Sequence, residues 1–150
     1  MLAEYLVGGL NRPRLRTLAG RVLAVRHLTD GAEFVETFRA LHHEYDFNEY
    51  TAYNITMRVY RGGGLTKDVV YLRGLTELLT YLRGKGSLEP LLVGKIALSH
   101  VPLIEELLWR KVLQPGPLQP RYLEYPDSVD RIKQLQTGKS IFDLAEELAA

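Results

Sequence analysis

The stretch TKDVVYLRGLTELLTYLR, residues 66–83, decides the fold class. Its leucines recur every three or four residues, which places them on one face of an α-helix. This stripe is the strongest in the sequence and consists of Leu72, Leu75, Leu79 and Leu82. Thr66 is a candidate N-cap for the helix, and the three glycines at 62–64 must interrupt any helix that precedes it. The pattern predicts a helix from Thr66 to about Gly84.

Helical spacing continues on both sides of this stretch, and no convincing run of alternating residues occurs. Asn48 is a candidate N-cap for the preceding helix, and Ser140 for the last one. The pair Asp30 and Glu33 indicates a variant capping box at the start of another helix, which precedes the one capped by Asn48. The sequence therefore predicts an all-α fold, a multi-helix orthogonal array.

The clearest break in the pattern is rich in proline. Three of the seven prolines fall within Leu113–Pro120, and we expect an extended segment over residues 113–126, draped over the surface. No internal repeat and no stronger boundary occurs, so residues 1–150 are expected to form a single all-α unit.

Composition excludes several function classes. With 46% hydrophobic residues among 150, the chain is not disordered, and its net charge of +1 does not favour nucleic-acid binding. No apolar run is long enough to cross a membrane. The absence of cysteine excludes thiol catalysis and fits the cytoplasm. A cluster of arginines without an intervening acid is expected to form a solvated helix flank: Arg12, Arg14, Arg16, Arg21 and Arg26.

The histidines do not predict a metal site. His42-His43-Glu44 resembles half of a zinc-binding helix, but position 47, where a second histidine would be needed, is Phe47. We therefore expect no metal ligands in this chain.

One constellation carries candidate chemistry: the segment RVYRGGGLTKDVVYL, residues 58–72. Arg58 and Arg61 lie at a helix C-terminus, and Lys67 and Tyr71 share a face of the next helix. With the helix N-terminus, these groups can converge on a carboxylate or phosphate. A plain helix–glycine–helix turn, in which Asp68 favours the helix N-terminus and the arginines cap carbonyl groups, explains the same residues. Both interpretations stay open on physical grounds.

The same segment resembles a signature block of the tyrosine/tubulin carboxypeptidase-like zinc metallopeptidases, whose bacterial members are often labelled flavohemoglobin expression-modulating QEGLA-motif proteins. The matching stretches within it are RVYRG, LTKD and YLRG. Further similarity covers AEYLVGGL (3–10), FVETF (34–38), VGKI (93–96) and PRYL (120–123). The resemblance thus extends over nearly the whole chain.

The resemblance implies a zinc hydrolase that removes a C-terminal residue from a peptide. In that family a His-Glu-x-x-x-His helix and a Glu-Gly-Leu segment supply the zinc ligands, and this sequence contains neither. We expect the chain to correspond to the C-terminal part of such an enzyme, with zinc bound only in the full-length form. Arg58, Arg61 and Lys67 would recognise the substrate carboxylate, and Tyr71 would donate a hydrogen bond to the scissile carbonyl or the tetrahedral intermediate.

The first residues support the same expectation. Leu2, Tyr5 and Leu6 have helical spacing, but no capping residue precedes them. If the chain begins inside a helix, these side chains should form an exposed apolar patch, or be covered by a second copy in a homodimer or by a missing N-terminal half. Two other function classes remain: a non-catalytic helical module that binds a peptide or protein, and an anion-binding regulatory domain.

Overall fold

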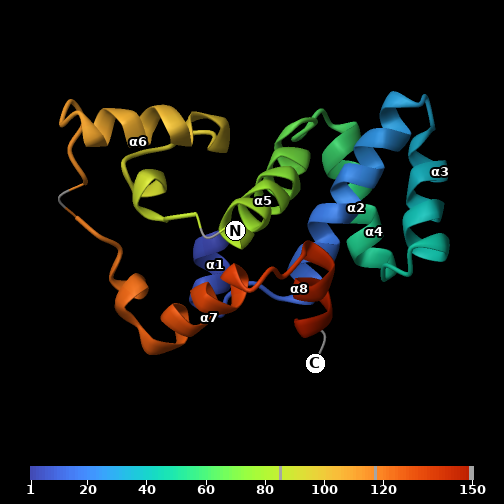
Figure 1. Ribbon diagram of the computed structural model, residues 1–150. Coiled ribbons are helices and arrows are strands. Elements are labelled where there is room, and N and C mark those ends of the chain that lie inside the picture. Colours follow the sequence, from blue (N-terminus) through green and yellow to red (C-terminus); the bar gives the residue numbers. More distant parts are fainter. Residues whose placement is uncertain (85, 117, 149–150) are drawn as a thin grey trace. The chain divides into compact units, whose positions relative to one another are not determined.

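The computed structural model describes residues 1–84, 86–116 and 118–148, which form helices and loops without a strand. The prediction of an all-α fold is confirmed. The α-helices are α1 (Leu2–Leu6), α2 (Arg12–Thr29), α3 (Phe34–Arg39), α4 (Glu49–Tyr60), α5 (Lys67–Arg83), α6 (Val101–Trp109), α7 (Pro126–Gln136) and α8 (Ile141–Glu147) (Figure 1). The shorter elements are a π-helix, η1 (Ala40–Glu44), and the 3-10 helices η2 (Glu89–Leu92), η3 (Leu98–His100) and η4 (Arg121–Glu124).

The described chain divides into two compact units. One comprises residues 10–73, and the other combines residues 1–9 with residues 74–148. Helix α5 contributes its first seven residues to the former unit and the rest to the latter. The expectation of a single unit over 1–150 stays a prediction.

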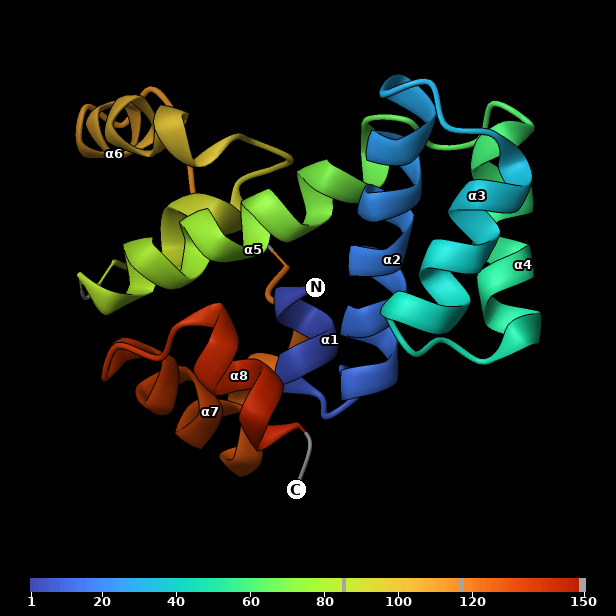
Figure 2. The same cartoon turned by 90° about the vertical axis from the view of Figure 1, so that its right-hand side faces the viewer.

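In the unit of residues 10–73, α2, α3 and α4 lie side by side (Figure 2). Their contact buries a small apolar core: Ala24, Leu41, Ala52, Ile55 and Val59. Gly20 makes the approach of α2 possible, because a Cβ atom there would lie 2.8 Å from the Phe47 ring and 3.1 Å from Ile55. The bare backbone of Gly20 thus leaves room for the Phe47 ring.

Side-chain caps fix where these helices begin. Asn48 accepts a hydrogen bond from the Thr51 amide at 2.8 Å, as its sequence position predicts. The capping box of α3 is formed by Glu33 and Glu36, so the prediction of a box at Asp30 and Glu33 is wrong by one turn. Asp30 instead ends α2, where its backbone is still helical and its carboxylate pairs with Arg26 at 3.5 Å.

In the other unit, α1 packs against α7 (Figure 1). Tyr5 is 3% exposed and Leu6 is 1% exposed, while Leu2 is half-buried. The carbonyl oxygen of Leu6 accepts hydrogen bonds from Ser128 Oγ at 2.9 Å and from Arg131 Nη1 at 2.7 Å. The prediction of an exposed patch at these residues is therefore wrong, because the chain itself covers Tyr5 and Leu6.

The proline-rich segment is partly as expected. Residues 114–116 and 118–120 adopt neither helix nor strand, whereas Pro117 lies outside the described residues. From Arg121 the chain turns into η4, and Pro126 is the first residue of α7. The extended part is thus shorter than the predicted 113–126, because proline suits the first turn of a helix as well as an extended segment.

Candidate functional site

The loop between α4 and α5 begins with a Schellman motif. The Gly63 amide donates to the Arg58 carbonyl at 2.9 Å, and the Gly62 amide donates to the Val59 carbonyl at 2.9 Å. Gly62 has a φ of +81°, the left-handed conformation that this motif requires. The carbonyl groups of Arg58 and Val59, in the last turn of α4, are therefore satisfied by the loop backbone.

Gly63 and Gly64 are required for two further reasons. A Cβ atom on Gly63 would lie 2.6 Å from the Arg58 carbonyl oxygen, which is backbone and cannot move aside. Gly64 has a φ of +81°, and a Cβ atom there would lie 3.0 Å from both Arg58 Nη2 and Asp68 Oδ2. These two glycines therefore allow the loop backbone to approach an ion pair of the chain itself.

That ion pair is centred on Asp68, in the first turn of α5. Asp68 is 2% exposed; its Oδ1 lies 3.4 Å from Arg21 Nη1, and its Oδ2 lies 3.8 Å from Arg58 Nη2. Within the described residues, neither Asp68 Oδ2 nor Arg21 Nε has a hydrogen-bond partner. Arg58 thus has an internal carboxylate beside it, while 41% of its side chain remains exposed.

The other predicted site residues are exposed in the same unit. Arg61 ends α4, Lys67 begins α5, and Tyr71 lies one turn further along α5 with 42% of its surface exposed. In the part of the chain that the structure describes, the side chains of these three residues form no hydrogen bond or ion pair. The structure therefore places all four predicted residues around one loop but joins only Arg58 to a partner.

Sequence reasoning missed Arg21. It was assigned to a solvated flank of arginines, but its side chain is 23% exposed and pairs with Asp68 across 47 residues of sequence. A signal was present, since Arg21 follows Leu18 by three residues and precedes Val25 by four, on the apolar stripe of α2. An arginine on an inner face needs a buried acid, and Asp68 is the buried acid that it meets.

The described residues do not fit a metal ion. Nowhere in residues 1–84, 86–116 and 118–148 do three histidine, aspartate or glutamate side chains gather closely enough to hold one. His42 Nδ1 lies 2.8 Å from the carbonyl oxygen of Phe47, so this ring nitrogen already has a hydrogen-bond partner in the chain.

The comparison with protein families decides the relationship. The family model of the microtubule-associated tyrosine carboxypeptidases matches residues 1–140. The chain belongs to this family. Membership agrees with the resemblance carried by the loop segment, whereas the narrower QEGLA-motif group stays a prediction. No curated protein and no solved structure matches the chain.

The match gives the chain a tyrosine carboxypeptidase-like relationship. The family match includes the whole α4–α5 loop and every candidate residue around it. Among the described helices none is both long and apolar enough to cross a membrane.

Proposed function

We propose that this chain supplies the substrate-carboxylate recognition of a hydrolase that removes a C-terminal residue of the tyrosine or aromatic type from a peptide. The observation that carries the proposal is the pair of exposed cations, Arg61 and Lys67, at the two ends of a loop whose backbone is fixed by three glycines. Neither side chain has an internal partner among the described residues, so both are available to an incoming carboxylate.

Each residue has a defined role in this proposal. Arg61 and Lys67 bind the terminal carboxylate, and Tyr71, one turn after Lys67 on α5, donates a hydrogen bond from its hydroxyl group to the scissile carbonyl or to the tetrahedral intermediate. Arg58 adds positive charge, while Asp68 holds its guanidinium in place. Holding the end of the peptide in one orientation is how such groups contribute to catalysis.

Zinc is assigned to the full-length enzyme by the family resemblance, and this stays a proposal. Because the described residues offer no ligand set for it, the role proposed for this chain is to bind and orient the peptide end and to stabilise the intermediate through Tyr71. The proposed location is the cytoplasm, which the absence of cysteine favours.

A peptide pair tests this role. We would titrate the chain into a fluorescent peptide that ends in a free tyrosine carboxylate, and into the same peptide with a C-terminal amide, and follow anisotropy. The acid should bind at least about tenfold more tightly, since only the acid forms charge-assisted hydrogen bonds. Arg61→Ala and Lys67→Ala should each remove most of this difference, and Arg39→Ala, an exposed arginine at the end of α3, should not.

Equal affinity for the acid and the amide would overturn the proposal. If both peptides bound equally well, the second function would be favoured: a non-catalytic helical module that recognises a peptide or protein by its side chains.

A further inference from the structure

A hollow of about 350 Å³ lies on the surface of α3 and α4, in the unit of residues 10–73. Four side chains line it: Phe38 from α3, and Glu49, Tyr50 and Tyr53 from α4. Three of the four are aromatic and the fourth is a carboxylate. None of the residues assigned to the α4–α5 loop site lines this hollow.

Two of the rings contact other aromatic side chains of the same unit. Tyr53 packs edge-to-face against Phe34 with ring centroids 5.8 Å apart, and Phe38 stacks on His42 at 6.0 Å. Tyr50 is 80% exposed and forms the rim. Two of the three rings therefore already pack against another ring of the chain, and the Tyr50 ring is the most exposed of the three.

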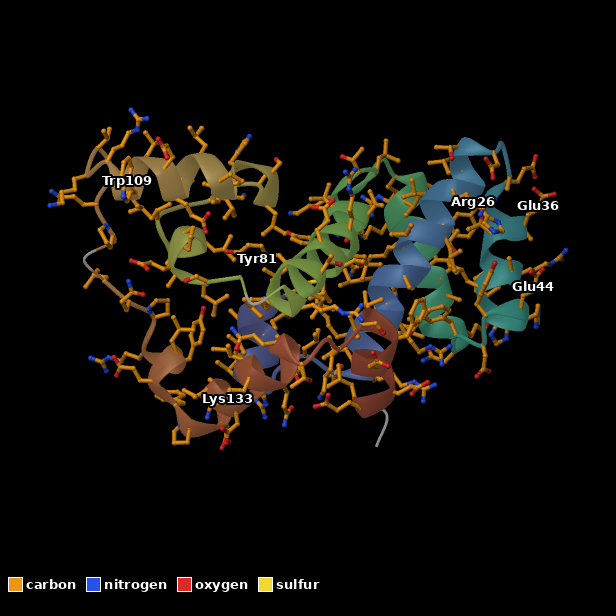
Figure 3. The ribbon with its side chains drawn as sticks, in the orientation of Figure 1. Arg26, Glu36, Glu44, Tyr81, Trp109 and Lys133 are labelled. Carbon is orange, nitrogen blue, oxygen red and sulfur yellow. The ribbon has the colours of Figure 1, made fainter. Side chains whose placement is uncertain are left out.

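The segment that carries this hollow has an excess of negative charge. Glu49 is exposed, and its side chain has no hydrogen-bond or ion-pair partner among the described residues. The surrounding segment, residues 33–50, contains five carboxylates and a single arginine. Two of the carboxylates, Glu36 and Glu44, project from α3 and η1 on the side away from α2 (Figure 3).

We propose that this hollow binds an alkylammonium group, the lysine side chain of a partner protein in its free or methylated form. Aromatic rings attract such a cation through their negative faces, and the Glu49 carboxylate adds a full charge at the same place. The rings also cover the apolar stem or methyl groups of the ligand. Among the side chains that line the hollow, only the two tyrosine hydroxyls could donate a hydrogen bond to an anion or a neutral polar group.

Blocked peptides test the proposal independently of the loop site. Their ends are acetylated and amidated, so they carry no terminal carboxylate for Arg61 or Lys67. Three forms differ only in the central residue: lysine, trimethyl-lysine and norleucine, which is neutral. Titrated into ¹⁵N-labelled chain, at least one cationic peptide should bind about fivefold or more tightly than norleucine, with shifts at the Tyr50 and Tyr53 amides.

Variants locate the effect. Tyr50→Ala and Glu49→Gln change exposed side chains and should each weaken binding of the cationic peptide severalfold. Glu44→Gln, on the same acidic surface but outside the hollow, and Trp109→Ala, an exposed ring of the other unit, should leave it unchanged. If the trimethyl-lysine peptide binds more tightly than the lysine peptide, the ligand is the methylated form. If the lysine peptide binds more tightly, the ligand is the free amine. Equal affinity for norleucine, or cation binding unaffected by Tyr50→Ala and Glu49→Gln, would overturn the proposal.

Discussion

The carboxylate of Asp68 lies 3.4 Å from the guanidinium group of Arg21 and joins the first turn of α5 to the middle of α2. Asp68 is nearly inaccessible to solvent, and both arginines beside it are at least partly exposed. The first turn of α5 is therefore held at the loop by the buried carboxylate of Asp68, which water hardly reaches and which the arginines beside it neutralise.

Removal of this charge should destabilise the unit. Asp68→Asn leaves Arg21 and Arg58 without their carboxylate, and we expect a loss of about 1–3 kcal/mol in the free energy of unfolding. The matched control is Asp30→Asn, because the Arg26–Asp30 pair is exposed at both ends and should contribute less than about 0.5 kcal/mol. Urea unfolding followed by circular dichroism measures both variants. An Asp68→Asn chain as stable as the wild type would show that the pair is dispensable.

Replacement of two glycines by alanine should change the free energy of unfolding in opposite directions. Gly63→Ala places a Cβ atom 2.6 Å from the Arg58 carbonyl oxygen and should cost about 1–3 kcal/mol of stability. Gly74 lies inside α5, and a Cβ atom there would have no neighbour within 4 Å. Gly74→Ala should therefore increase the free energy of unfolding by about 0.5–1 kcal/mol. Thermal unfolding distinguishes them, and a shift of the same sign for both would contradict the loop geometry.

The contact of α1 with α7 should depend on Arg131. Its Nη1 donates to the carbonyl oxygens of Leu6 and Tyr5 at 2.7 and 3.3 Å, where α1 ends. Arg131→Met keeps the apolar stem but loses these bonds, for an expected cost of about 1.5–3 kcal/mol in unfolding free energy. Lys133→Met, which removes an exposed ion pair with Asp130, should cost less than about 0.5 kcal/mol. Similar urea midpoints for the two variants would refute this role of Arg131.

Stability should also fall at alkaline pH because of Tyr5. Burial, and then the nearby charge and hydrogen bond of Glu147, raise the pKa of Tyr5 from 10.0 to about 12. The unfolded chain therefore releases this proton at a lower pH than the folded chain does. The stabilisation is complete below pH 10 and is lost as the pH rises towards 12.

The measurement compares the wild type with Tyr5→Phe, which has no proton to release at this position. Urea midpoints at about pH 9 and about pH 11 should differ more for the wild type than for the variant. An identical decrease in both proteins would assign the alkaline loss to other groups.

Local features of this fold were predictable from sequence. The Asn48 and Ser140 caps, and the break at the three glycines, each depend on residues within five positions of one another, so the sequence contains the whole interaction. The periodic leucines predicted a helix that the structure starts at Lys67, one residue after the expected N-cap.

Features that join distant segments were not predictable in this way. The sequence showed arginines near glycines, but not that Asp68 lies between Arg21 and Arg58, since this requires α2, α4 and α5 to meet. Burial of Tyr5 and Leu6 was missed for the same reason, because the α7 residues that cover them lie more than 120 positions away. The placement of the candidate site residues around one loop followed from local sequence. The pairing of Asp68 with Arg21 and Arg58 did not.

Asp68 neutralises only one of the two guanidinium groups beside it, so the loop keeps an excess of positive charge once Arg61 and Lys67 are included. Mobile anions from the solvent must collect near such a surface, and an arriving peptide end displaces them. The dissociation constant of an acidic peptide should therefore rise with ionic strength, as the screening length falls from about 30 Å at low salt to about 10 Å near physiological salt. Measurements at low salt would then overstate how firmly this loop holds a peptide under cellular conditions.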